Sequence, residues 1–156
     1  MSDDAKFEEG REAPLNLGAM DLDDLQVISS LVQDAVFPIT EMTWRARDRR
    51  LALLVNRFRW EDQGQARHGA ERVRSLLVID NVLGVASQGL DLSDKDTVLS
   101  LMSVAFEPDT EGAGHVLLTL AGDGAIRAQV EALEITLKDV TRPYRAPSGR
   151  VPDHGP

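Results

Sequence analysis

The sequence RLALLVNRFRW at residues 50–60 has a two-residue period that is typical of a β-strand. One face carries Leu51, Leu53, Val55, Arg57 and Arg59. The other face carries Ala52, Leu54, Asn56, Phe58 and Trp60. The first half is apolar on both faces, whereas the second half alternates arginines with aromatic residues. We therefore predict a strand here whose two ends differ in polarity.

The same period recurs towards the C-terminus and predicts further strands joined by tight turns. Residues 72–85 form either a strand pair or one long bent strand, because Asp80-Asn81 is a turn signal. Residues 98–106 are apolar on both faces, which is typical of a strand covered on both sides. Gly122-Asp123-Gly124 predicts a hairpin turn after a strand at 115–121, since glycine adopts positive φ without strain. A short last strand follows this turn.

Two segments have helical periods instead. Residues 21–35 place an apolar residue every three or four positions, with Asp21 as the candidate N-cap and Pro38 beyond the end. A second helix is predicted within residues 129–140 from the spacing of Val130, Leu133, Leu137 and Val140.

The predicted fold class is therefore α+β, with the N-terminal helix, a sheet and the C-terminal helix in that order. The sheet has about six or seven mostly antiparallel strands and forms a bent sheet or small barrel. A pleckstrin-homology-like barrel, which ends in a C-terminal helix, is one known solution of this kind and is an analogy of fold alone.

The two ends of the chain differ from its middle. Residues 1–14 are acidic and nearly free of large apolar side chains, which predicts a mobile acidic tail. Residues 143–156 hold four of the seven prolines and are predicted to be a Pro-rich tail. Residues 15–142 then form a single globular domain, in which the polar residues 61–70 are expected to be a loop.

Composition excludes several classes of protein. The chain has 156 residues and no cysteine, so disulfides, thiolate catalysis and cysteine-ligated metals are excluded. No apolar run is long enough for a transmembrane helix, and the acidic first residues exclude a secretory signal, so a cytoplasmic location is expected. The three histidines have no metal-binding spacing, and no phosphate-binding or nucleophile motif is present. We therefore expect no metal and no cofactor.

Charge is distributed unevenly along the chain. The net charge is −9, yet nine of the 14 arginines lie between Trp44 and Arg74, where only four acidic residues occur. This span carries +5 and the rest of the chain carries −14. Arginine suits bidentate recognition of phosphate or carboxylate and also stacks on aromatic rings. The candidate ligand-binding residues are Asn56, Arg57, Arg59, Trp60, Arg72 and Arg74.

Two interpretations of these arginines stay open. If the two arginine-bearing strands pair, four guanidinium groups could meet in one anion site. Alternatively, the arginines pair with the protein's own carboxylates on a solvated sheet face. Nucleic acid is disfavoured as the ligand, because the net negative charge repels a polyanion and seven aromatic residues are too few for a stacking platform.

Several short strings occur in the order expected for a known family. They are Pro14-Leu15-x-Leu17, Asp23-Asp24-Leu25, Gln33-Asp34-Ala35, Asn56-Arg57-Phe58-x-Trp60-Glu61, Phe106-Glu107-Pro108, Ala121-Gly122-Asp123-Gly124-Ala125-Ile126-Arg127 and Val130-Glu131. Together they resemble a family of uncharacterised alphaproteobacterial proteins, a domain of unknown function of about this length. The resemblance implies a small bacterial cytoplasmic protein and assigns no catalytic residue.

These observations lead to three hypotheses of function. The first is a non-catalytic binding or interaction module that self-associates, because a strand apolar on both faces at 98–106 needs a cover that a homodimer provides. The second is an Arg-rich sheet face that binds an anionic ligand, which is phosphate, another small anion, an acidic protein or, as the disfavoured case, nucleic acid. The third is a carboxylate-dependent enzyme that uses Glu61 with His68.

Overall fold

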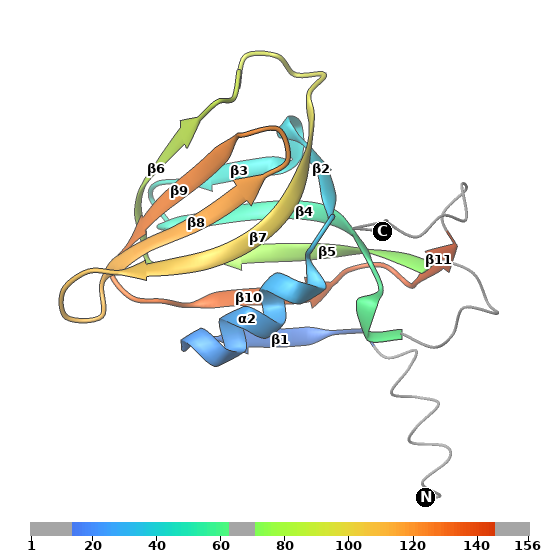
Figure 1. The fold of residues 1–156 in the computed structure, drawn as a ribbon, viewed down its shortest axis with the longest axis horizontal. Coiled ribbons are helices and arrows are strands. Elements are labelled where there is room, and N and C mark those ends of the chain that lie inside the picture. The colour runs from blue at the N-terminus through green and yellow to red at the C-terminus, as the bar shows by residue number, and fades with distance from the viewer. Residues whose placement is uncertain (1–13, 63–70, 146–156) are drawn as a thin grey trace, which may run out of the picture.

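The computed structural model describes residues 14–62 and 71–145, and β-strands make up most of this part of the chain (Figure 1). The strands are β1 (Asn16–Ala19), β2 (Val36–Pro38), β3 (Met42–Arg45), β4 (Arg50–Phe58), β5 (Glu71–Ile79), β6 (Val82–Gln88), β7 (Val98–Pro108), β8 (Gly114–Leu120), β9 (Ala125–Val130), β10 (Ile135–Asp139) and β11 (Tyr144–Arg145). The described α-helix is α2 (Leu22–Leu31), and two single 3-10 turns are η1 (Ile39–Glu41) and η2 (Trp60–Asp62).

All strands belong to one antiparallel sheet that folds over on itself. The order is β1-β10-β5-β4-β2-β7-β8-β9-β6, with β11 also paired to β5 and β3 also paired to β4. Figure 1 shows β6, β9, β8 and β7 as one layer facing a second layer of β3, β4, β5, β10 and β1. Strand β2 joins the layers, because Val36 pairs with Asn56 of β4 on one side and with Ser100 of β7 on the other.

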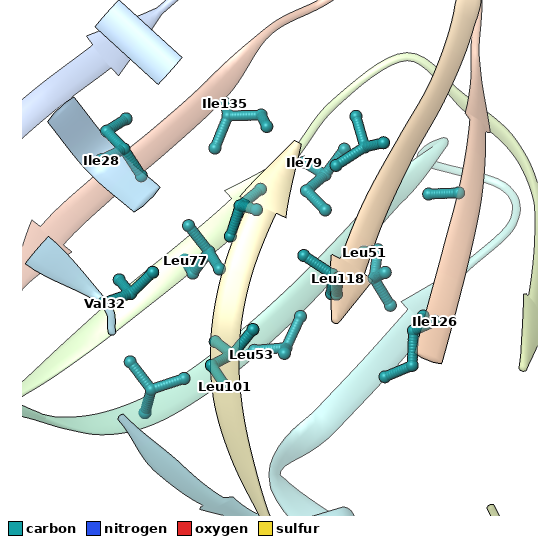
Figure 2. Close-up of a cluster of buried hydrophobic side chains, with 14 of the residues drawn as sticks. Ile28, Val32, Leu51, Leu53, Leu77, Ile79, Leu101, Leu118, Ile126 and Ile135 are labelled. Atoms are coloured by element: carbon teal, nitrogen blue, oxygen red, sulfur yellow. The ribbon is translucent and has the colours of Figure 1, made fainter. Parts of the chain in front are cut away.

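The core lies between the two layers. Alternate residues of β4, β5, β8 and β9 point inward and are buried, as in the β4 pattern of Leu51, Leu53 and Val55. Figure 2 shows side chains from both layers meeting in this space, together with two from the N-terminal helical segment: Ile28, Val32, Leu51, Leu53, Leu77, Ile79, Leu101, Leu118, Ile126 and Ile135. Burying a side chain of this size stabilises the fold by about 1.5–3 kcal/mol.

Helix α2 closes one open side of the sheet. It packs against β1 and β7 with its buried residues Leu25, Ile28 and Leu31. The N-cap prediction is confirmed, because the Asp21 carboxylate accepts a 2.8 Å hydrogen bond from the backbone N–H of Asp24. The helix is shorter than the predicted 21–35.

The reason for the early end is sheet pairing. Asp34 adopts a left-handed conformation with φ of 64°, and its N–H donates to the carbonyl of Leu101 in β7. The N–H of Leu101 in turn donates to the carbonyl of Ala35. The chain therefore leaves the helix to enter β2 before Pro38 is reached.

The predicted α+β fold with a C-terminal helix is wrong, and the described chain is mostly antiparallel sheet with one α-helix. Residues 129–140 form the end of β9, a turn and β10 in place of the helix. Ile135 and Leu137 face the core at a two-residue period, whereas Val140 is exposed. Strand β10 is paired on both sides, with β1 and β5, and this pairing outweighs the helical spacing. The pleckstrin-homology analogy, which required a C-terminal helix, is not supported by the described residues.

The strand count was underestimated because short strands carry little periodic signal, as in β1, β2 and β11. Residues 72–85 do form two strands with a turn at Asn81, whose φ is 61°. However, β5 and β6 do not pair with each other, because the chain passes from one layer to the other at this turn.

The hairpin at Gly122-Asp123-Gly124 is confirmed, with φ of 84° at Gly122 and 73° at Asp123. Residues 1–13, 63–70 and 146–156, which include most of the predicted tails and loop, lie outside the described residues. No helix within the described ranges has the length and apolar character needed to span a membrane.

Candidate functional site

The alternation of β4 divides the predicted site residues between the two faces of the sheet. Arg57 and Arg59 point inward and are buried, whereas Asn56 points outward. The register pairs Asn56 with Arg74 and Phe58 with Arg72, which places both β5 arginines on the outer face. The four guanidinium groups therefore do not meet in one patch.

The inner group is centred on Arg57, whose side chain is 0% exposed. Its guanidinium donates to both carboxylate oxygens of Glu61, at 2.8 and 2.7 Å. It also donates to Asp139 in β10 at 2.9 Å and to the hydroxyl of Ser75 in β5 at 2.9 Å. A charge at this depth requires such partners, because an unpaired buried charge is strongly destabilising.

Asp139 is the second centre of the inner group, and its side chain is 4% exposed. It accepts a 2.7 Å hydrogen bond from the Ser75 hydroxyl and a 2.9 Å hydrogen bond from the backbone N–H of Leu15. The N–H of Asp139 donates to the carbonyl of Leu15 at 2.8 Å. Arg57 and Asp139 thus tie together β4, β5, β10 and the residue that precedes β1.

The electrostatics of the inner group keep Arg57 charged. Burial alone lowers the pKa of Arg57, but the hydrogen bonds and negative charges of Glu61 and Asp139 outweigh burial and raise its pKa above the ordinary value. Arg59 lies beside this group and forms an ion pair with Glu71. The inner arginines therefore pair with the protein's own carboxylates.

Trp60 follows this group in the chain. Its indole N–H donates to the carbonyl of Gln33 at 3.0 Å, and its ring lies 4.8 Å from that of Phe58.

A cavity of about 790 Å³ lies next to the inner group. Its lining includes Arg59, Glu71, Asp139, Thr141 and Arg142. Its buried acidic residue, Asp139, and its buried basic residue, Arg59, already form the ion pairs described above. This cavity therefore offers few free groups for chemistry.

The outer face of β4 and β5 carries a groove made of two adjoining hollows. The larger, of about 400 Å³, has an apolar floor and polar walls: Glu41, Thr43, Arg45, Arg50, Ala52, Leu54, Leu76 and Val78. The smaller, of about 170 Å³, continues along β4 and includes Pro38, Asn56 and Arg74. Glu41 and Leu54 line both hollows. We call these two hollows together the outer groove.

Arginines stand at both ends of the outer groove. Arg50 donates from Nε to Asp80 at 2.9 Å, and this hydrogen bond and charge raise the pKa of Arg50. Arg45 lies 4.0 Å from Asp48. Arg74 is exposed and makes no side-chain hydrogen bond or ion pair within the described residues.

The end of the outer groove near Arg74 is polar and aromatic. Asn56 donates a hydrogen bond from its side-chain amide to the hydroxyl of Tyr144. Arg72 donates to the carbonyl of Asn56 at 3.4 Å. The structure therefore brings Asn56, Arg72 and Arg74 together on the outer face and separates them from the buried Arg57 and Arg59. Trp60 is partly buried against the core and contacts Phe58.

The described residues show no centre for metal chemistry, because no group of three potential ligands is present among them. His115 lies in β8, and His68 and His154 lie outside the described residues, as does any pairing of His68 with Glu61. Glu61 is occupied by the bidentate contact with Arg57. The geometry thus gives no support to the carboxylate-dependent enzyme.

Sequence reasoning missed Ser75, Asp139 and Tyr144. Asp139 was hidden by the predicted helix, in which it would face solvent. As part of a strand it shares a face with Ile135 and Leu137, so a charged residue on an apolar face was the available signal. Tyr144 fell within the predicted tail, and nothing in its sequence context indicated contact with Asn56.

Comparison with known proteins adds one finding. A family model described as a protein of unknown function, DUF2948, matches residues 15–154. No curated protein and no solved structure matches this chain.

Proposed function

The chain belongs to the DUF2948 family of proteins of unknown function, and from its geometry we propose that it is a non-catalytic binding module. Its binding surface is the outer groove on β4 and β5. The partner is an acidic protein that lays an extended segment along this groove. The observation that carries the proposal is an apolar floor with an arginine at each end, one of which is unpaired among the described residues.

The floor of the outer groove supplies apolar contact. Ala52 and Leu54 of β4 lie beside Leu76 and Val78 of β5, and all four side chains are only partly buried. An apolar side chain from a partner would cover this surface, at a gain of about 25 cal/mol per Å² removed from water. The floor is therefore suited to the central residues of a bound segment.

The arginines set the length and charge of that segment. Arg50 and Asn56 are six residues apart on β4, which corresponds to about 20 Å at the rise of a strand. Arg74 lies opposite Asn56, so the two cationic ends are separated by a similar distance. An extended segment of about six residues spans this interval. Carboxylates at its two ends would meet the arginines, and its middle would avoid Glu41.

Both end arginines have capacity for a ligand. Among the described residues, Asp80 occupies only Nε of Arg50 and leaves its two Nη groups for a carboxylate. Within the part of the chain that the structure describes, the whole guanidinium group of Arg74 is available. Bidentate arginine–carboxylate pairs are short and directional, so they would fix the register of the segment.

A second copy of this chain fits the outer groove poorly. A two-fold axis through the groove would bring arginines of one copy towards arginines of the other, and like charges across an interface are unfavourable. Nucleic acid is opposed by the net charge of −9 and by Glu41 and Asp80 at the groove. An acidic protein segment avoids both objections.

The test uses a fluorescein-labelled peptide of about six residues with glutamates at both ends and leucines in the middle. Fluorescence polarisation should show salt-dependent binding to the full chain, and Arg74→Ala should weaken it about tenfold or more. Arg127→Ala is the matched control, because Arg127 is an exposed arginine on β9, in the other layer.

Three outcomes decide the result. Loss of affinity in Arg74→Ala but not in Arg127→Ala supports the proposal, particularly if a lysine-ended peptide of the same length does not bind. Binding of inorganic phosphate at the groove, with no peptide binding, would establish a small-anion site and overturn the protein partner. Equal affinity in the two variants would remove the outer groove as the binding surface.

A further inference from the structure

Strand β6 forms one margin of the sheet and pairs only with β9 among the described residues. It is seven residues long, whereas the marginal strands β1 and β3 have four and β11 has two. Its sequence, VLGVASQ, contains no charged residue and no proline. Natural proteins usually protect an exposed edge with charges, prolines, bulges or a covering element. Among the described residues, strand β6 has an irregularity between Val82 and Gly84, and its first residue is covered, because the N–H of Val82 donates to the carbonyl of Arg49.

The alternation of hydrogen bonds along the sheet shows which residues of β6 have backbone N–H and C=O groups that point away from β9. The N–H of Leu120 donates to the carbonyl of Gly124, so these two residues form a hydrogen-bonded pair of the β8–β9 ladder. By alternation, Ile126 and Ala128 also direct their backbone groups towards β8. Arg127 therefore directs its backbone groups towards β6.

The same alternation applies on β6. Ala86 is opposite Arg127, and Gly84 and Gln88 lie opposite Gln129 and Ala125, so these three residues bond to β9. The N–H and C=O groups of Val85 and Ser87 then point away from β9. No hydrogen bond to these groups exists among the described residues, so the free edge presents two donors and two acceptors in a row.

We propose that two copies of this chain form a dimer by antiparallel pairing of β6 with β6 across a two-fold axis. The register that uses all of the open groups places Val85 of one copy opposite Ser87 of the other. Ala86 then lies opposite Ala86 at the axis, in a pair whose Cβ atoms are about 4.5–5.5 Å apart. The two sheets become one continuous sheet.

The occupant is a second copy because the edge is self-complementary. A two-fold axis places the same strand on both sides, so any charge on β6 would face an identical charge nearby. The absence of charge from β6 removes this conflict in a protein whose net charge of −9 otherwise opposes self-association. Leu83, which is 46% exposed at the start of the strand, adds apolar surface at the same edge. The dimer proposal rests on the open backbone groups of β6 and does not depend on the outer groove on β4 and β5.

The test measures the mass of the full chain in solution by light scattering between about 1 and 100 μM, where a dimer of moderate affinity forms. The expected mass of the unaltered protein is twice the chain mass of 17.1 kDa. Ser87→Pro removes one open donor and leaves the bonds between β6 and β9 in place, so it should give a folded monomer. Circular dichroism and the melting temperature report whether the variant is folded.

A second pair of variants tests the register at the axis. Ala86→Glu places two carboxylates opposite each other and should raise the dissociation constant at least tenfold, with partial recovery in high salt. Ala86→Gln is the matched control, because it has the same size without the charge, and it should remain a dimer. A monomer for the unaltered protein at 100 μM would overturn the proposal. A dimer that persists in both Ser87→Pro and Ala86→Glu would overturn it as well, because the contact would then lie elsewhere. The acidic-peptide binding of the outer groove should be unchanged in Ser87→Pro.

Discussion

Replacement of Asp139 by asparagine should destabilise this protein far more than the loss of an equally short ion pair at the surface. Asp139→Asn keeps the shape of the side chain and removes its charge from the contact with Arg57, which is fully buried. Removal of one partner of a buried ion pair typically costs about 3–5 kcal/mol, because the other charge is left without compensation. Glu61 retains its two bonds to Arg57, so we expect the lower end, about 3 kcal/mol.

The chain offers a closely matched control. Arg50 and Asp80 also form an arginine–aspartate pair at 2.9 Å, but the side chain of Arg50 is 53% exposed. Exposed pairs contribute about 0–1 kcal/mol, because water screens the charges and the side chains lose entropy. Asp80→Asn should therefore reduce the free energy of unfolding by less than about 1 kcal/mol. The two ion pairs have the same length, whereas Asp139 is buried and also accepts hydrogen bonds from Ser75 and Leu15.

Urea unfolding at neutral pH, followed by circular dichroism, measures both values by linear extrapolation. The double variant Arg57→Met with Asp139→Asn completes a cycle, and the two changes should be non-additive by about 1–3 kcal/mol because they remove the same interaction. Equal losses for Asp139→Asn and Asp80→Asn would refute the argument from burial. Additive effects in the cycle would show that Arg57 and Asp139 do not depend on each other.

Three further changes test local features of the fold. Asp21→Ala should lower the free energy of unfolding by about 1 kcal/mol in urea denaturation, because it removes the helix cap. Gly114→Ala should cost about 1–3 kcal/mol in the same assay, since an added methyl group would overlap the backbone carbonyl of Glu107. Ser93→Ala should move the lowered pKa of Asp91 upward, part of the way towards its ordinary value, in an NMR titration, because it removes the hydroxyl hydrogen bond to the charged carboxylate and keeps the bond from the backbone N–H. In this last variant the melting temperature should fall slightly near neutral pH, and the difference from the unaltered protein should disappear as the pH falls through the pKa of Asp91, because the lost hydrogen bond stabilises the charged carboxylate.

The sequence predicted those parts of the fold in which a period and a local signal agree. Residues 50–58 alternate over nine positions, and the structure has a strand there with the predicted faces. The cap at Asp21 and the turn at Gly122-Asp123-Gly124 were also predictable, because both depend on residues close in sequence. The strand at residues 135–139 was not predictable, because a segment of five residues satisfies a helical and a strand period about equally well. The partners on either side of β10 decide its conformation, and they lie far away in sequence.

The incorrect helix at residues 129–140 also affected the interpretation of the arginines. Arg57 sits at an inward position that continues the face of Leu53 and Val55, so its position alone indicated burial. A buried arginine on a strand requires a carboxylate at an inward position of a neighbouring strand. With residues 129–140 assigned to a helix, no neighbouring strand carried such a carboxylate, so the sequence left both a bound anion and the protein's own carboxylates open as partners of Arg57. Once β10 is placed beside β5, Asp139 lies opposite Ser75 and the requirement is met within the chain. An arginine on the apolar face of a predicted strand is therefore better used as a constraint on strand pairing than as evidence for a binding site. By the same rule, Arg74 on the outer face has no such internal requirement, and this is why the outer groove carries the proposed function.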